Sequence, residues 1–223
     1  MSSKAAGDAG SSIRRVGRSE ITGIVLAGGQ GRRFGGGKAM ARVGGQALLD
    51  RAAGVLSTFC TEVIVAGGSG GQTTKVTNTV RHVYDTFELQ GPLVGIYSGL
   101  QASRTDINVV VACDMPFLNP DLLQELAGLS GKYDIVVPVV AGKAQPTHAV
   151  YRLRCADAIR AALGQGISSP LQFLKRVRTL FVPEGKIAVL DPHFLSFCDV
   201  DTQADLEKAE QTALALGKGG LLK

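Results

Sequence analysis

The sequence predicts an α/β fold, a single-domain, Rossmann-like arrangement in which a mostly parallel sheet carries helices on both faces. Short apolar runs alternate with segments whose apolar residues recur at helical spacing, which is typical of βαβ units. A glycine-rich loop directly follows the first apolar run, and aspartates follow several of the later runs. With 223 residues the chain has room for one large core, so we expect no second folded domain.

The expected strands are the short apolar runs, in order along the chain. Ile21–Ala27 is the first, and Ile107–Cys113 is apolar almost throughout, as expected for a central strand buried on both faces. The other expected strands are Glu62–Ala66, Val80–Tyr84, Asp134–Val140, Thr147–Arg152, Thr179–Val182 and the segment near Phe197–Val200. A turn at Gly142–Lys143 is expected to join the strands on either side of it.

The expected helices lie between these strands. In Gln46–Phe59 the apolar residues recur three and four positions apart, so one side of this helix is expected to cover a face of the sheet. Thr202 is the expected N-cap of the last helix, with Asp205 as its capping-box partner. The remaining expected helices are Leu93–Ala102, Pro120–Gly128, Cys155–Leu163 and Pro170–Arg176.

The two ends of the chain are expected to lie outside the fold. Residues 1–18 are small, polar and basic without an apolar centre, which indicates a disordered basic tail rather than a leader peptide. The folded domain is expected to span residues 19–216, and residues 217–223 are expected to form a frayed C-terminus. A net charge of +5 suits an anionic small molecule, although a diffuse basic surface accounts for it equally well.

The cysteines indicate a reducing compartment. The four cysteines are widely spaced and form no C-x-x-C pair, so we expect buried, reduced thiols in a cytoplasmic protein. They are Cys60, Cys113, Cys155 and Cys198. No apolar stretch approaches the roughly 20 residues of a membrane-spanning helix.

Residues 26–38 read LAGGQGRRFGGGK and predict a site for a nucleoside triphosphate. Glycines let the backbone N–H groups of such a loop approach anionic oxygens, and Arg32, Arg33 and Lys38 add positive charge. A glycine-rich turn with incidental surface charge is the alternative interpretation.

Two common phosphate-binding motifs are excluded at this loop. The P-loop requires G-x-x-x-x-G-K-[ST], but Arg32 occupies its first glycine position and Ala39 lacks the metal-binding hydroxyl. The dinucleotide motif G-x-G-x-x-G fails because Phe34 occupies its third glycine position.

Carboxylates follow the expected strands at the edge where this loop emerges. Asp85 and Asp114 each follow an expected strand, and Asp199 and Asp201 belong to the end of the last one. Open α/β sheets bind ligands beyond the carboxyl ends of their strands, so we expect these residues to share one site with the loop.

Five segments, in order, resemble the MobA family of nucleotidyltransferases, the molybdenum cofactor guanylyltransferases. The resemblance extends from about Ile21 to Ala213. The first segment, residues 26–35, fits L-A-G-G-x-[SG]-x-R-[MF]-G and is followed shortly by a lysine. The other segments are Gly91–Ile96 (GPL-x-G), Cys113–Leu118 (C-D-x-P-[FY]-[LI]), Gln145–Tyr151 and Asp199–Thr202.

The resemblance implies a nucleotidyltransferase-type fold and a specific reaction. GMP would pass from MgGTP to the terminal phosphate of molybdenum-molybdopterin cofactor, giving the guanine dinucleotide cofactor and pyrophosphate. Mg²⁺ is the implied cofactor, and GTP and molybdopterin are the implied substrates. A molybdoenzyme or a cofactor-insertion protein is a further candidate partner, whereas no nucleic acid or membrane partner is expected.

The resemblance also implies roles for individual residues. Arg33 would grip the triphosphate, Lys38 would bind a phosphate, and Asp114 would hold Mg²⁺, so these three form the expected catalytic set. Asp201 is the expected second metal ligand, but Asp199 has a similar claim, and either could instead cap the last helix. The implied nucleotide-binding residues are Leu26, Ala27, Gly28, Gly29, Gly31, Arg33, Lys38, Asp85 and Asp114.

The resemblance also implies that the base is selected at the backbone of Leu26, Ala27 and Gly28 and at Asp85. Its carboxylate would accept hydrogen bonds from the ring N–H and the exocyclic amine of guanine, and adenine offers no such pair. The family often has asparagine at the position of Ala66. Alanine has no polar side-chain atom, so this position cannot hydrogen-bond a ligand through its side chain. A cytidylyltransferase acting on the same cofactor is therefore an alternative, although such relatives tend to have Leu-Ala-Ala-Gly where this chain has Leu-Ala-Gly-Gly.

The acceptor is expected to meet Gln145, Pro146 and Thr147, with Lys175 and Arg176 near its phosphate; a solvated basic face is the alternative for these two cations. The acceptor phosphate is already ionised at neutral pH, so no general base is required. His82, His148 and His193 are scattered without the spacing of metal ligands, so each is expected to be structural. A sugar-phosphate nucleotidyltransferase and a non-catalytic carrier of GTP or cofactor remain the alternative functions.

Overall fold

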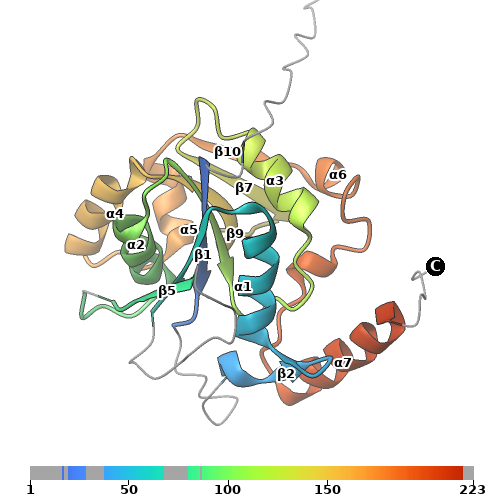
Figure 1. The fold of residues 1–223 in the computed structure, drawn as a ribbon. Coiled ribbons are helices and arrows are strands. Elements are labelled where there is room, and N and C mark those ends of the chain that lie inside the picture. The colour runs from blue at the N-terminus through green and yellow to red at the C-terminus, as the bar shows by residue number, and fades with distance from the viewer. Residues whose placement is uncertain (1–16, 18–19, 29–37, 68–79, 86, 218–223) are drawn as a thin grey trace, which may run out of the picture.

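The computed structural model describes residue 17 and residues 20–28, 38–67, 80–85 and 87–217 (Figure 1). Within them an eight-stranded sheet has the order β10-β7-β9-β6-β1-β4-β5, and β8 pairs with β7 beside this path. The strands are β1 (Ile21–Leu26), β4 (Glu62–Ala66), β5 (Val80–Val83), β6 (Ile107–Ala112), β7 (Ile135–Val140), β8 (Lys143–Ala144), β9 (His148–Arg152) and β10 (Thr179–Val182).

The long strands of the sheet are parallel except for β9. In the middle, β1 pairs in parallel with both β4 and β6, so that Leu26 lies between Ala66 and Ala112. The strand β9 runs against β6 and β7, which places its first residue, His148, opposite Val111 near the carboxyl end of β6. The predicted α/β fold with a mostly parallel sheet is therefore confirmed.

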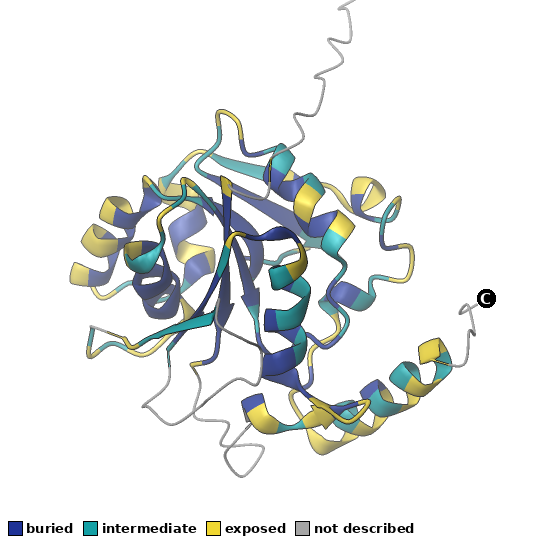
Figure 2. Ribbon diagram, in the orientation of Figure 1, coloured by how far each residue is buried: buried dark blue, intermediate teal, exposed yellow. Residues whose placement is uncertain are grey.

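Helices cover both faces of the sheet, each over its own apolar core. One core contains α1 (Leu48–Phe59) and α3 (Pro120–Gly128). The other contains α2 (Pro92–Ala102), α4 (Cys155–Gly164) and α5 (Pro170–Phe173). Figure 2 shows the buried sides of these helices turned toward the sheet.

Helix α2 lies unusually close to β1 because two of its residues are glycines. A Cβ atom at Gly95 would lie 3.2 Å from Leu26 Cδ2, and one at Gly99 would lie 2.6 Å from Ile24 Cγ2. The second distance is shorter than any relaxed contact, so the absence of side chains at these positions allows the close packing.

A small third layer lies beside the main sheet. It consists of the 3-10 helix η3 (Lys38–Met40), the hairpin strands β2 (Arg42–Val43) and β3 (Gln46–Ala47), and α7 (Gln203–Gly217), which lies along the hairpin in Figure 1. Its own apolar cluster contains Val43, Leu48, Val200 and Ala209. The helix α6 (Glu184–Ile187) packs beside β7, at the upper right of Figure 1.

The expected start of the first helix is wrong. Gln46 and Ala47 are strand residues, paired with Val43 and Arg42, because the chain reverses at Gly44 and Gly45, whose φ angles are +59° and +75°. The helix α1 itself begins at Leu48.

The expected last strand, near Phe197–Val200, is also wrong. Its first part belongs to the 3-10 helix η5 (Leu195–Phe197), and the residues that follow form no strand. The buried carboxylate of Asp191 accepts hydrogen bonds from the N–H groups of Leu195 and Ser196, and the N–H of Val200 donates to Asp114 O. These bonds replace a sheet ladder.

The irregular segment also contains one of the four cysteines. Cys60, Cys113 and Cys155 are buried as expected, but Cys198 is exposed because it lies in this irregular segment. All four are free cysteines.

The capping box of the last helix is confirmed. Thr202 N donates to Asp205 Oδ2 at 2.9 Å, and Asp205 N donates back to Thr202 Oγ1 at 3.2 Å. Among the described residues no helix is long and apolar enough to cross a membrane.

Candidate functional site

The glycine-rich loop is described only at its two ends. Gly29, Gly31 and Arg33, like Arg32, lie outside the described residues, so their expected roles stay predictions. Lys38 is the first residue of η3, on the side of the molecule that carries the β2–β3 hairpin (Figure 1).

The start of the loop is fixed between the ends of two neighbouring strands. Ala27 N donates to Ala66 O at 2.9 Å, and Cys113 N donates to Leu26 O at 3.1 Å. The turn after β1 is thereby held between the ends of β4 and β6. Ala27 is buried and Gly28 is exposed, so the chain emerges into solvent at the carboxyl edge of the sheet.

Asp85 lies beside Gly28 at this edge. Gly67, which follows β4 and has a φ angle of +93°, separates them: a Cβ atom on it would lie 3.0 Å from Gly28 Cα and 3.5 Å from Asp85 Oδ2. A side chain at residue 67 would therefore fill the space between the expected base-binding backbone and the expected base-binding carboxylate.

The carboxylate of Asp85 is partly shielded by the protein. Its Oδ1 accepts a hydrogen bond from Ser98 Oγ of α2 at 3.2 Å. Partial burial raises the pKa of Asp85 above its ordinary value, and the hydrogen bond from Ser98 opposes this shift.

Ala66 contributes to this region through its backbone. Its side chain is fully buried in the core beneath α2, and its carbonyl accepts the bond from Ala27. The alanine at this position is thus a core residue in the structure.

Asp114 follows β6 and lies against the segment that carries the other two candidate metal ligands. Asp114 O accepts from Val200 N at 3.0 Å, so Asp199 and Asp201 flank the residue that bonds to it. The structure therefore brings the backbones of these three aspartates together, although the last segment is not a strand.

Residues other than these three aspartates cap the two neighbouring helices, which includes the last helix, where Asp199 or Asp201 was the alternative cap. Asn119 caps α3, since its Oδ1 accepts from Asp121 N at 2.9 Å and from Leu122 N at 3.1 Å. Thr202 and Asp205 form the capping box of α7.

The donor set at Asp114 suits Mg²⁺ bound together with a substrate. Mg²⁺ is commonly held by one or two carboxylates, with phosphate oxygens and water completing its octahedron. Among the described residues no group of three or more His, Cys, Asp or Glu side chains is placed to hold a metal ion by itself. Asp114 with Asp201 or Asp199 would supply the one or two carboxylates of such a site.

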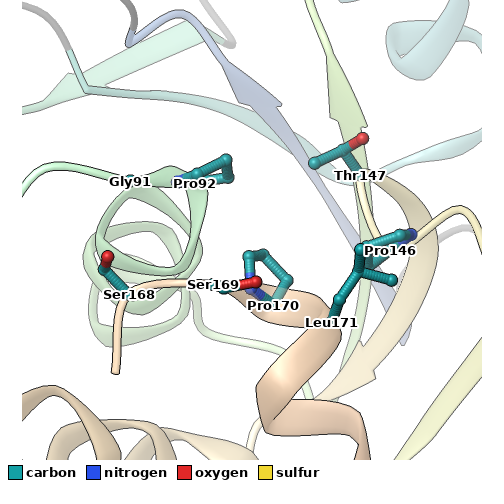
Figure 3. Close-up of a pocket in the computed structure, with 8 residues that line it drawn as sticks. All are labelled: Gly91, Pro92, Pro146, Thr147, Ser168, Ser169, Pro170 and Leu171. Atoms are coloured by element: carbon teal, nitrogen blue, oxygen red, sulfur yellow. The ribbon is translucent and has the colours of Figure 1, made fainter. Parts of the chain in front are cut away.

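A pocket of about 400 Å³ opens beside this edge (Figure 3). Its lining comes from the start of α2, from the chain before β9 and from the start of α5; Figure 3 shows Pro92 and Thr147 on opposite sides of the opening. The lining residues are Gly91, Pro92, Pro146, Thr147, Ser168, Ser169, Pro170 and Leu171. None of these side chains carries a charge.

The pocket includes only part of the expected acceptor site. Pro146 and Thr147 line it, whereas Gln145 does not and bonds through its N–H to Pro138 O at 2.9 Å. Lys175 and Arg176 are exposed in the 3-10 helix η4 (Leu174–Arg176) and do not line the pocket; Arg176 Nη1 donates to Gln165 Oε1 at 2.7 Å.

The histidines show no metal-binding arrangement in the described part of the chain. His148 is fully buried with its ring 4.5 Å from that of Phe197, and burial lowers its pKa to about 3, so it is neutral. His82 lies within β5, and His193 is exposed.

The sequence analysis did not identify Ser98, nor the hydrogen bonds that Asp191 accepts from the N–H groups of Leu195 and Ser196. Ser98 stands three residues after Gly95 and one before Gly99, so small residues at helical spacing marked the face of α2 that approaches the sheet. Nothing local in the sequence marked Asp191, because its partners depend on the path of the chain from 191 to 196.

Comparison with known proteins gives consistent matches over most of the chain. A family model described as the MobA-like NTP transferase domain matches residues 23–179. A molybdenum cofactor guanylyltransferase of Desulfosudis oleivorans is 32% identical over 197 residues, covering 85% of this chain and 94% of the relative. A probable molybdenum cofactor guanylyltransferase of Pelotomaculum thermopropionicum is 37% identical over 194 residues, covering 87% and 94%.

Solved structures agree. The molybdopterin-guanine dinucleotide biosynthesis protein A of Archaeoglobus fulgidus superposes with a TM-score of 0.73 at 26% identity, over 86% of this chain and 98% of the other. A 2-C-methyl-D-erythritol 4-phosphate cytidylyltransferase of Thermus thermophilus, at 19% identity and a TM-score of 0.65, shares the fold. Because the family model covers more than half of the chain and relatives exceed 30% identity over most of both lengths, the chain belongs to the family of MobA-like NTP transferases.

Proposed function

We propose that this protein transfers GMP from MgGTP to the terminal phosphate of molybdenum-molybdopterin cofactor, releasing pyrophosphate. Its relatives at 32% and 37% identity are named molybdenum cofactor guanylyltransferases, and the family is one of nucleotidyltransferases. The observation that carries the proposal is the placement of Gly28, Asp85 and Asp114 along one edge of the sheet, beside an uncharged pocket.

The nucleotide is proposed to lie over the ends of β1, β4 and β5. The exposed backbone at Gly28 faces the base, and Asp85 accepts from the ring N–H and the exocyclic amine of guanine. Leu26, Ala27 and Lys38 bound the loop whose N–H groups, with Arg33, are proposed to hold the triphosphate.

The reaction exchanges one phosphoanhydride bond for another at the α-phosphorus of GTP. An oxygen of the acceptor phosphate forms a bond to this phosphorus, the bond to the bridging oxygen of the β-phosphate breaks, and pyrophosphate leaves with that electron pair. The attacking oxygen is already anionic, so the protein contributes position and charge neutralisation instead of a general base.

The carboxylates at the end of β6 are proposed to serve the metal. Asp114, with Asp201 or Asp199, would hold Mg²⁺, which when bound neutralises charge on the phosphate oxygens. Lys38 and Arg33 are proposed to stabilise the negative charge that grows on the leaving pyrophosphate.

The acceptor is proposed to occupy the pocket of Figure 3. Three prolines and Leu171 offer apolar contact for a flat ring system, and the hydroxyls of Thr147, Ser168 and Ser169 can hydrogen-bond its polar edge. Lys175 and Arg176 do not line the pocket. We propose that they contact the terminal phosphate of the acceptor outside it.

The proposed reaction implies the remaining assignments. GTP is available in the cytoplasm, so we place the protein there. We further predict that a molybdoenzyme or a cofactor-insertion protein receives the product.

Pyrophosphate release in the presence of Mg²⁺, molybdenum-loaded molybdopterin and each of the four nucleoside triphosphates in turn tests the proposal. Of the four nucleotides, we expect only GTP to give pyrophosphate release. Release with CTP alone would support cytidylyl transfer and remove the base-selecting role of Asp85. Binding of GTP without pyrophosphate release would support the non-catalytic carrier.

A further inference from the structure

Ser98 is a buried hydroxyl directed at the carboxylate that we propose selects the base. It lies in α2 with 5% of its surface exposed, within the continuously buried stretch from Leu93 to Leu100. Ser98 Oγ is 3.2 Å from Asp85 Oδ1 and 3.1 Å from Val94 O. A serine hydroxyl has one proton, so these two acceptors share a single donor.

The position of Ser98 follows from the packing of its helix. Gly95 and Gly99 let α2 lie directly against β1, and Ser98, between them on the same side, is carried to the end of β5 where Asp85 begins the next loop. Any residue that pushed α2 away from the sheet would also withdraw this hydroxyl from Asp85.

The two oxygens of the Asp85 carboxylate have different surroundings. Oδ1 is held by Ser98, and Oδ2 lies on the side of Gly67, 3.5 Å from the position a Cβ atom would take there. Since a carboxylate oxygen can accept more than one hydrogen bond, both oxygens can still accept from guanine. Fixing one oxygen sets the rotation of the carboxylate, which bidentate recognition requires.

We propose that Ser98 is a positioning residue for guanine selection, which holds the carboxylate of Asp85 in the orientation that accepts both N–H groups of the base. This inference rests on the proposed function, in which Asp85 contacts guanine. In this inference the preference for guanine depends on two residues, Asp85 after β5 and Ser98 in α2. Only Asp85 was among the site residues expected from the sequence.

The electrostatic setting agrees with this role. Partial burial raises the pKa of Asp85 and therefore favours its neutral form, which has lost one acceptor. The hydrogen bond from Ser98 stabilises the ionised form that guanine needs. The bond between the two side chains thus maintains both the orientation and the charge.

The test compares GTP with ITP, whose base lacks the exocyclic amine. Dissociation constants by calorimetry and kcat/KM for both nucleotides are measured for the wild-type protein, Ser98→Ala, Ser98→Cys and Asp85→Asn. We expect Ser98→Ala to reduce the preference for GTP over ITP about tenfold, through weaker GTP binding, and Ser98→Cys to have a smaller effect. The KM for the acceptor and kcat with saturating GTP should change far less.

A control variant separates positioning from helix stability. Thr212→Ala removes a hydroxyl-to-carbonyl bond of the same kind within α7, where Thr212 Oγ1 donates to Lys208 O at 2.9 Å, away from Asp85. We expect it to leave the preference for GTP over ITP unchanged. The thermal unfolding of each variant is measured alongside, and Ser98→Cys supplies the comparison if Ser98→Ala unfolds.

The outcomes distinguish the inference from the function beneath it. Loss of the preference in both Asp85→Asn and Ser98→Ala, with no further loss in the double variant, supports the pair. A preference lost in Asp85→Asn but intact in the Ser98 variants overturns the role of Ser98 and leaves the proposed function standing. An unchanged preference in Asp85→Asn overturns the role of Asp85, and the inference with it.

Discussion

The two edges of the sheet treat their carboxylates in opposite ways, as Asp134 and Asp85 illustrate. At the amino end of β7, Asp134 accepts from Arg154 Nε at 2.6 Å and from the side chain and the backbone N–H of Arg178. These bonds, the one from Arg178 first, hold its pKa well below the usual range. At the carboxyl edge, Asp85 receives a bond from the neutral hydroxyl of Ser98, and burial raises its pKa.

The difference separates stabilising charges from charges available to a ligand. The amino edge also carries the ion pairs of Arg152 with Asp106 and of Arg81 with Glu62, so its carboxylates are matched by cations of the chain itself. A carboxylate whose partner is a neutral hydroxyl keeps its charge available for a bound molecule. We therefore expect substitutions at the amino edge to change stability and those at the carboxyl edge to change activity.

The largest effect is expected for Asp114→Asn, which keeps the shape of the side chain and removes its charge. Without this carboxylate the proposed metal site loses its central ligand, so kcat should fall by about 10³-fold or more. The unfolding temperature should stay close to that of the wild type. Near-normal turnover measured as pyrophosphate release would remove Asp114 from the metal site.

A smaller effect on the same edge is expected for Lys38→Ala. Loss of one phosphate-binding cation should raise the KM for GTP by about tenfold or more while the fold is retained. Titration of GTP by calorimetry measures this directly. An unchanged affinity would place Lys38 outside the nucleotide site.

At the amino edge, Asp134→Asn should lower the free energy of unfolding by about 2 kcal/mol and leave kcat unchanged. Because the folded pKa of Asp134 is lowered, its contribution is complete above the unfolded pKa of about 3.9 and is lost as the pH falls below that value. Chemical unfolding at neutral pH and near pH 3 should therefore show a difference between wild type and variant that shrinks in acid. A variant that lost activity but not stability would contradict the division between the edges.

The smallest expected effect on nucleotide binding comes from a substitution that also lowers stability. Gly99→Ala places a Cβ atom 2.6 Å from Ile24 Cγ2, and such overpacking costs about 1–3 kcal/mol. By displacing α2 it should also weaken GTP binding a few-fold through Ser98. Gly164→Ala, in α4, is the control, because a Cβ atom there would meet nothing within 4 Å. It should raise the free energy of unfolding slightly, by about 0.4–1 kcal/mol, and leave GTP binding unchanged. Equal effects of the two substitutions would show that the packing of α2 does not reach the site.

The sequence predicted the strands that are defined by continuous apolar runs and missed the segments that are defined by partners far along the chain. β4 and β10 agree with the prediction in both bounds, and β1 and β6 are one residue shorter at their ends. The segment near Phe197–Val200 resembled a strand because several of its residues are apolar. In the structure Phe197 packs on His148, and Val200 belongs to the apolar cluster of the small third layer.

The same distinction applies to the candidate site. Asp85 and Asp114 could be placed at the carboxyl edge because each follows a recognisable strand. Ser98 could not be linked to Asp85 from sequence, because their contact depends on how closely α2 approaches β1. The pocket likewise depends on a junction between the start of α2 and the chain before α5, where Leu93 N donates to Ser168 O at 3.2 Å. No local pattern predicts such a junction.

The reversed direction of β9 has an evolutionary consequence. The proposed nucleotide side is built from loops that connect parallel strands through crossovers, and these connections are long and hard to alter without disturbing the sheet. Pro146 and Thr147 instead lie on the return path from β7 to β9, where the chain reverses through Ala141 and Gly142 at φ angles of +49° and +72°. A reversal of this kind can lengthen, shorten or change its side chains while the parallel strands stay in register. The proposed acceptor side of this architecture can therefore change while the strands that carry the proposed nucleotide side stay as they are.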